Sequence, residues 1–123
     1  ALFAAGEIRA GNAASGIRGA DAVGGLYAAS VRLHGDGTPR TKHVTTNVVV
    51  DVDEDAGTAT ARSYFTVLQQ LDDFPLQVIV AGRYHDDFVR ADGAWRFAVR
   101  RIHVDLQGDL SRHLLGVTSV APR

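Results

Sequence analysis

The stretch KHVTTNVVVDV at residues 42–52 has a density of valine and threonine that favours an extended β-strand. An acidic turn that ends in glycine follows at residues 53–57, and residues 58–68 are predicted to form the returning strand. Farther along the chain we expect a loop at residues 69–75 and a third long strand at residues 76–89. Short connections between successive strands predict antiparallel pairing.

A fourth strand is predicted at residues 95–106. It follows the sequence Arg-Ala-Asp-Gly at residues 90–93, which contains the Asp-Gly pair typical of hairpin turns. All four strands exceed the usual strand length of about five or six residues. We therefore expect an antiparallel meander that twists into a strongly curved sheet.

Glycine is concentrated in residues 1–37, where short elements are expected instead of long strands. Residues 1–5 are predicted to be the end of a helix and residues 7–10 a short strand. Residues 21–33 are predicted to form an amphipathic helix, because apolar side chains recur at three- and four-residue spacing, and the glycines and proline of residues 34–39 end it. The fold class is therefore α+β: helices on one face of a curved, cone-shaped sheet that encloses a pocket.

The composition limits the classes of function. A chain of 123 residues with 46% hydrophobic and 22% charged residues fits one globular domain and disfavours disorder. Its net charge of -1 argues against a nucleic-acid-binding surface, and the absence of cysteine excludes disulfides and thiolate chemistry. No apolar run approaches the roughly 20 residues that cross a bilayer. We expect a cytoplasmic protein with no membrane or nucleic-acid partner.

Four motifs, in this order and spacing, point to a known family. They are KHVTTN at residues 42–47, ATARSY at 59–64, GRYHD at 82–86 and DGAWRF at 92–97. Together they resemble the SnoaL-like domains of the nuclear-transport-factor-2-like superfamily, which are related to scytalone dehydratase and to the β subunits of ring-hydroxylating dioxygenases.

The resemblance extends over residues 1–115 and implies one SnoaL-like domain over residues 1–123 with a cystatin-like half-barrel fold. It implies that the opening sequence ALFAAG at residues 1–6 is the middle of the family's second helix. The family's first helix, which often carries a pocket tyrosine and aspartate, is then upstream or missing.

Alternation along each strand sorts side chains into two faces. By similarity to scytalone dehydratase, one face is expected to line the pocket, with the candidates His43, Asn47, Tyr64, Thr66, Gly82, Tyr84 and Arg100. The opposite face is expected to carry an apolar row made of Phe65, Val67, Trp95, Phe97 and Val99. An exposed row of this kind predicts a homodimer through the outer sheet face.

His43 is the candidate catalytic residue. Its position matches a histidine that acts as the proton-transfer base in scytalone dehydratase, and imidazole exchanges protons near neutral pH. Tyr64 and Tyr84 have hydroxyls that can polarise a carbonyl, and Arg100 can recognise an anionic ligand. Each of these side chains is also consistent with a purely structural role. The dehydratase's second histidine has no counterpart near Leu68.

The leading hypothesis is a protein that binds a small apolar or aromatic molecule, with proton-transfer chemistry of the isomerase, dehydratase or cyclase type and no cofactor. A non-catalytic ligand-binding or dimerisation module is one alternative. A structural subunit like a dioxygenase β chain is another, since one fold hosts many functions. A metal site is not expected, because His43, His85 and His103 lie on different strands with conflicting faces.

Overall fold

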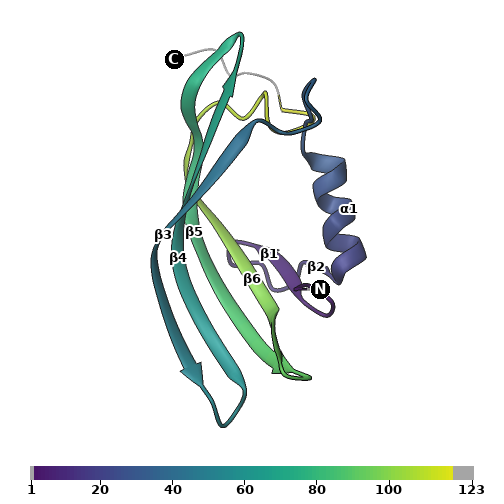
Figure 1. Ribbon diagram of the computed structural model, residues 1–123, viewed down its shortest axis with the longest axis vertical. Coiled ribbons are helices and arrows are strands. Elements are labelled where there is room, and N and C mark those ends of the chain that lie inside the picture. Colours follow the sequence, from purple (N-terminus) through teal and green to yellow (C-terminus); the bar gives the residue numbers. More distant parts are fainter. Residues whose placement is uncertain (1, 118–123) are drawn as a thin grey trace.

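The computed structural model describes residues 2–117 and shows one helix and a single curved sheet (Figure 1). The elements are β1 (Glu7–Ala10), β2 (Ile17–Arg18), α1 (Ala20–Ser30), β3 (Thr41–Asp53), β4 (Thr58–Leu71), β5 (Phe74–Ala91) and β6 (Ala94–Gln107). The six strands are ordered β2-β1-β6-β5-β4-β3 across the sheet. In the part of the chain that the structure describes, no helix is long and apolar enough to cross a membrane.

The predicted meander of four long strands is confirmed: β3, β4, β5 and β6 pair antiparallel, each with the next along the chain. Every one of these strands extends beyond its predicted bounds. The loop expected at residues 69–75 is a tight turn instead, because β4 continues to Leu71 and β5 begins at Phe74, which pairs with it.

The N-terminal region departs from the prediction in two ways. The short strand at residues 7–10 is confirmed as β1, which pairs parallel with β6 and antiparallel with the unpredicted β2. The predicted helix end is wrong over residues 2–5, which form turns and bends, while Ala1 lies outside the described residues. Tertiary contacts decide this conformation: the Phe97 backbone N–H donates to the Leu2 carbonyl oxygen over 3.0 Å, and the Phe3 ring stacks on Phe97 with centroids 4.6 Å apart.

Helix α1 ends at Ser30, three residues before its predicted end. Val31 is already extended because it forms a β-bridge with Leu114, which ties the end of the helix to the C-terminal segment. The helix lies across from the concave side of the sheet, and only its Val23 side chain is buried (Figure 1). The expectation of several helices is therefore corrected to one helix within residues 2–117.

The sheet is strongly curved but does not close into a barrel (Figure 1). Register shifts interrupt the pairing of β3 with β4 between Thr46 and Val49. They also interrupt the pairing of β5 with β6 between Ala81 and Gly82 and between Asp87 and Phe88. Bulges of this kind bend a strand and increase its twist. The expected cone-shaped enclosure is thus an open, curved sheet in this chain.

The main core lies at one end of the concave side. Its buried residues are Phe65, Val67, Phe74, Ile79 and Leu110. The segment after β6 folds back across the sheet, where Leu114 and Val117 pack against this cluster. The core therefore fastens the C-terminal segment to β4 and β5 and leaves the middle of the concave side open to solvent.

Candidate functional site

The two faces of the sheet are defined by the side chains of β4. Ser63, Phe65 and Val67 are buried, whereas Tyr64 between them is 53% exposed. Ser63 pairs with Tyr84 of β5, and the Phe65 ring stacks on the Tyr84 ring with centroids 4.6 Å apart. Tyr84 therefore lies on the concave face with Phe65, and Tyr64 lies on the convex face.

The predicted face assignment of β4 is corrected by this register. Tyr64 and Thr66 lie on the convex face, away from Tyr84 and Arg100. Asn47 sits in the bulge of β3 with a φ of 54° and lines a hollow on the convex side together with Tyr64. Alternation assigns faces within one strand, but relating the faces of two strands requires their register, which alternation does not supply.

The apolar row expected on the outer face is not there. Phe65 and Val67 are buried in the concave core, and the Phe97 ring packs against Phe3 and Phe88. The register leaves Val99 on the convex face, opposite Asp87. The observation that motivated a dimer through this face therefore does not hold, and the dimer itself stays a prediction.

A groove of about 380 Å³ follows the concave face across the middle of the sheet. It is lined by Thr45, Val48, Val50, Val52, Ala59, Ala61, Ser63, Asp86, Phe88, Trp95 and Arg100. Most of these side chains are apolar; the polar ones are Thr45 on the edge strand β3, Ser63 on β4, Asp86 on β5 and Arg100 on β6. Ligand sites typically combine apolar walls with a small number of placed polar groups.

The charged group in this groove is the pair formed by Arg100 and Asp86. The Arg100 Nε and Nη2 donate to the two Asp86 carboxylate oxygens over 2.9 and 3.0 Å, and the Asp86 side chain is 4% exposed. Burial lowers the pKa of Arg100, but the hydrogen bond and negative charge of Asp86 outweigh it and raise this pKa overall. The guanidinium stays charged, and its Nη1 has no hydrogen-bond partner within residues 2–117.

Two aromatic rings hold the guanidinium in place. Its central carbon lies 3.8 Å from the centroid of the Tyr84 ring and 4.8 Å from that of Phe97. Burial raises the pKa of the Tyr84 hydroxyl, although the positive charge of Arg100 opposes this shift. Tyr84 is therefore protonated at neutral pH, and its hydroxyl is able to donate a hydrogen bond.

His43 lies on the concave face, where it pairs with Val67 of β4. It is two residues from Thr45, which lines the end of the groove, a separation of about 7 Å along a strand. Partial desolvation lowers the pKa of His43 below 6.5, so the neutral imidazole predominates at neutral pH. His43 thus lies on the concave face beyond Thr45, outside the residues that line the groove, as a group able to accept a proton.

The predicted site residues divide into three groups. Arg100 and Tyr84 lie next to each other. His43 is on the same face but far from them: it pairs with Val67 of β4, whereas Asp86, the partner of Arg100, pairs with Ala61 of β4. These two positions of β4 are about 20 Å apart at the rise of a strand. Asn47, Tyr64 and Thr66 belong to the other face.

Asp86 is the functional candidate that the sequence prediction missed. Its signal was available: it lies two residues after Tyr84 on the same strand and so points to the same face. A carboxylate on an otherwise apolar face needs a cationic partner, and Arg100 supplies it from β6.

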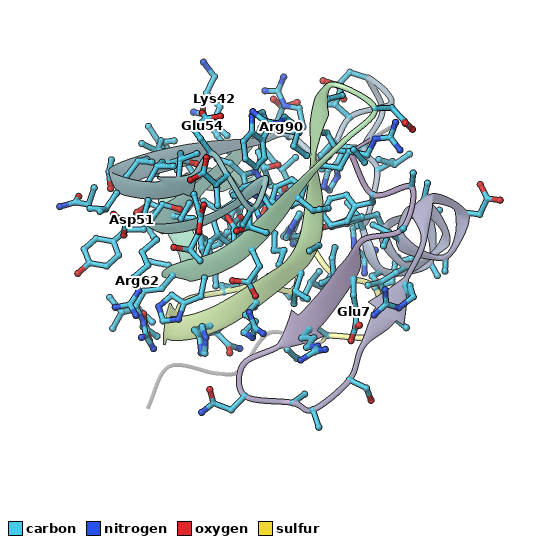
Figure 2. The ribbon with its side chains drawn as sticks, turned by 90° about the horizontal axis from the view of Figure 1, so that it is seen from below. Glu7, Lys42, Asp51, Glu54, Arg62 and Arg90 are labelled. Atoms are coloured by element: carbon cyan, nitrogen blue, oxygen red, sulfur yellow. The ribbon has the colours of Figure 1, made fainter. Side chains whose placement is uncertain are left out.

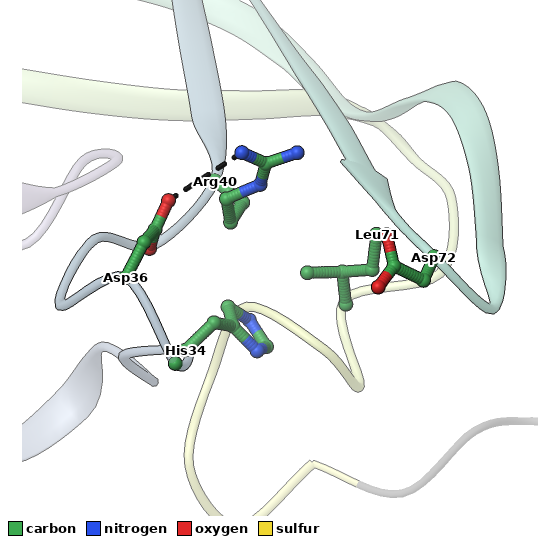
Figure 3. Close-up of a pocket in the computed structure, with 6 residues that line it drawn as sticks. His34, Asp36, Arg40, Leu71 and Asp72 are labelled. Carbon is green, nitrogen blue, oxygen red and sulfur yellow. Dashed lines mark hydrogen bonds and ion pairs between the residues drawn. The ribbon is translucent and has the colours of Figure 1, made fainter.

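A separate hollow of about 270 Å³ lies at one end of the sheet, where Figure 3 shows His34, Asp36, Arg40, Leu71 and Asp72 around it. Arg40 and Asp36 form an exposed ion pair of 3.4 Å on one side of it. Hydrogen bonds from the Thr38 backbone and hydroxyl lower the pKa of Asp36. Within the described residues, no group of three or more histidine or carboxylate side chains is arranged to hold a metal ion.

The chain matches the family model described as SnoaL-like domain over residues 1–101. A protein of unknown function from Mycobacterium tuberculosis is similar in structure, with 27% identity and a TM-score of 0.64 over 85% of this chain and 59% of that one. A scytalone dehydratase-like protein from Novosphingobium aromaticivorans has 23% identity and a TM-score of 0.64 over 98% and 74% of the two chains.

A hexachlorocyclohexane dehydrochlorinase from Novosphingobium barchaimii has 19% identity and a TM-score of 0.62, over 98% of this chain and 77% of that one. The chain spans 59% of the length of the Mycobacterium tuberculosis structure. None of the curated proteins compared with the chain matches it. The structural likenesses establish the fold, and the family model covers most of the sequence. The chain therefore belongs to the SnoaL-like family, with the fold of the nuclear-transport-factor-2-like proteins.

Proposed function

We propose that the concave groove binds a small apolar or aromatic molecule that carries a carbonyl or anionic oxygen. The observation that carries this proposal is the cluster of Arg100, Asp86 and Tyr84 within apolar walls. An oxygen of the ligand accepts hydrogen bonds from the free Nη1 of Arg100 and from the Tyr84 hydroxyl. The valines and alanines of β3 and β4 cover the rest of the molecule.

Proton transfer by His43 is the second part of the proposal. Its lowered pKa keeps the ring neutral at neutral pH, the state that a general base requires. Because it lies beyond Thr45, the atom it would deprotonate belongs to the part of the ligand at that end of the groove, away from the oxygen bound by Arg100. The structural likeness to a scytalone dehydratase-like protein and to a dehydrochlorinase supports chemistry of this type, which needs no cofactor.

A thermal-shift screen with small aromatic carbonyl compounds tests the binding proposal. A ligand raises the melting temperature because it stabilises the native state by RT ln(1 + [L]/Kd). The variant Ala61→Phe fills the groove and is expected to lose this shift. Thr60→Phe is the matched control, because Thr60 precedes Ala61 on β4 and points to the convex face. Equal shifts in both variants would show that ligands bind elsewhere.

Deuterium exchange tests the proton transfer. In D₂O, a compound that binds in the groove and carries an acidic C–H group at the Thr45 end is expected to exchange that hydrogen faster with the protein than without it. His43→Gln should remove this acceleration and keep the thermal shift, because the base is lost and the groove is intact. His85→Gln, on the convex face, is the control. Acceleration that persists in His43→Gln would exclude His43 as the base.

A further inference from the structure

Strand β3 forms a free edge of the sheet. It is the last strand in the order, and over its 13 residues it pairs with β4 alone among the described strands. The opposite edge is β2, which has only two residues. A long edge strand presents a row of unpaired backbone N–H and C=O groups that another strand can use.

The side chains of this edge are unusually apolar for a surface strand. Its exposed valines are Val44, Val48, Val49, Val50 and Val52, with exposures between 42% and 60%. They occupy both faces, because their partners on β4 alternate between the convex and concave sides. Proteins protect such an edge with charges, bulges or a covering element. Strand β3 has Lys42 and one bulge, but none of the described residues covers it.

The charges of β3 are separated along its length. Lys42, the only lysine of the chain, is near the start of the strand, and Asp51 and Asp53 are near its end. All three lie on the convex face, since they pair with Leu68, Thr60 and Thr58 of β4. Figure 2 shows Asp51 on the side of the sheet away from α1. None of the three forms an ion pair within residues 2–117.

We propose that β3 pairs antiparallel with β3 of a second copy of this chain, in the register that sets Lys42 opposite the partner's Asp51. Two-fold symmetry makes this contact twice. The same register sets Val44 opposite the partner's Val49, and both lie on the convex face. A parallel arrangement in register instead sets Lys42 against the partner's Lys42, which is repulsive.

The side chains of the two strands remain on matching faces in this register. The bulge between Thr46 and Val49 shifts the alternation by one residue near the centre of the strand. Convex positions are therefore even-numbered before the bulge and odd-numbered after it. In the proposed register, the half of β3 before the bulge pairs with the half after the bulge in the partner. Convex side chains then lie beside convex ones and concave beside concave, whereas a shift of one residue breaks this match at every pair.

The dimer also changes the groove, a consequence that rests on the proposed function. His43 lies opposite the partner's Val50, and Val50 lines the groove in the same row as Ala61 and Asp86. Each groove thus receives the partner's His43 at its open edge, one strand spacing of about 5 Å from its wall. The partner's imidazole then lies in the row of residues across the sheet that contains Arg100. The His43 of the same chain lies in a different row, too far from Arg100 to share a ligand atom with it.

Carbodiimide cross-linking tests the register directly, because it joins an amine to a carboxylate in contact with it. Lys42 and Asp51 of one chain are nine residues apart along β3, at most about 30 Å at the rise of a strand, so this bond is not expected within one chain. We expect a Lys42–Asp51 linked peptide, detected by mass spectrometry, that joins an isotope-labelled copy to an unlabelled one. The absence of this linked peptide, or cross-links from Lys42 to acidic residues outside β3, would overturn the proposal.

Charge reversal tests the same contact in solution. Strand addition buries less area than a large obligate interface, so we expect a reversible dimer with a Kd on the order of micromolar. In sedimentation velocity, Lys42→Glu and Asp51→Lys are each expected to weaken the dimer at least tenfold, and the double variant is expected to restore it. Asp21→Lys, an equal change of charge on α1, is the control.

The outcomes separate this proposal from the proposed function. A wild-type protein that is monomeric across this concentration range, or a double variant as weak as the single ones, refutes the edge dimer. The thermal shift produced by a groove ligand does not require β3 pairing, so Lys42→Glu is expected to keep it. If Lys42→Glu is monomeric and still accelerates deuterium exchange as wild type does, the partner's His43 has no part in the site. The edge dimer is then supported, but its contribution to the groove is refuted.

Discussion

Arg100 and Arg83 each bind a carboxylate through two hydrogen bonds of 2.8 to 3.0 Å, but the two pairs differ in burial. Arg100 holds Asp86, which is 4% exposed, whereas Arg83 and Asp105 are both 40% exposed. Arg100→Ala leaves a buried carboxylate without a counter-charge and is expected to cost about 3 kcal/mol of unfolding free energy. Arg83→Ala should cost far less, because water screens that pair.

Urea unfolding of the two variants measures this difference. If Arg83→Ala destabilises the protein as much as Arg100→Ala, burial is not what distinguishes the pairs. Arg100→Lys is an informative companion, since it keeps the charge but lacks the planar group that makes two bonds and stacks on Tyr84.

The histidines predict how stability depends on pH. Burial lowers the pKa of His43 below the usual 6.5, and it also lowers the pKa of His113, helped by the charges of His43 and His34. The unfolded chain then binds more protons than the native state below pH 6.5. Stability is therefore expected to be full above about pH 6.5 and to fall as the pH drops through the native pKa values.

His43→Gln should make the decline of unfolding free energy between neutral and mildly acidic pH less steep, because one of these groups is removed. NMR titration of the ring protons provides the direct check in the wild-type protein. A His43 ring that titrates above pH 6.5 would contradict both this account and the assignment of a neutral base.

At the scale of elements, β5 and β6 approach each other closely at Gly82. A Cβ at this position would overlap the His103 carbonyl oxygen and come within 2.8 Å of the Phe65 ring. Gly82→Ala is expected to destabilise the protein by roughly 1–3 kcal/mol, since the backbone and a buried ring must both move. Chemical denaturation measures the loss, and Gly35→Ala, where nothing lies within 4 Å, is the control.

Helix α1 carries two glycines in its interior with nothing within 4 Å of either. Gly24→Ala is expected to stabilise the protein by about 0.5–1 kcal/mol, because alanine loses less backbone entropy in a helix. Gly19→Ala, just before the helix, should destabilise it, since Gly19 has a φ of 89° that alanine rarely adopts. A melting temperature unchanged by Gly24→Ala would indicate that α1 is not stably formed in solution.

The long strands could be predicted from sequence because their signals are local: valine-rich runs and the Asp-Gly turn at residues 92–93. Elements decided by distant contacts could not. Residues 2–5 avoid a helix because Phe3 stacks on Phe97, and β2 is too short to produce a pattern.

The candidate site follows the same division. Tyr84 and Arg100 were identified correctly as neighbours on one face, because each strand alternates regularly around them. Tyr64 was placed on the wrong face, because relating the faces of β4 to those of β5 requires the register in which Ser63, not Tyr64, pairs with Tyr84. Asp86 was missed because its role depends on the partner that β6 provides.

At the scale of the whole molecule, the two faces of the sheet have different chemistry. The convex face carries ion pairs such as Arg83 with Asp105 and Arg101 with Asp87, whose charges largely cancel. The concave face is apolar around the single buried pair of Arg100 with Asp86. Apolar walls beside a buried charged pair make the concave groove the expected binding surface for a small apolar molecule, in preference to the polar hollow on the convex side.

An NMR titration of labelled protein with a small aromatic carbonyl compound from the thermal-shift screen tests this claim most directly. We expect the backbone signals of Ala61, Ser63 and Asp86, which line the groove, to shift together with a single binding constant. Arg62 and Tyr64, which alternate with them on the convex face, should shift far less. Shifts centred on Arg62 and Tyr64, or none at any of these positions, would contradict it.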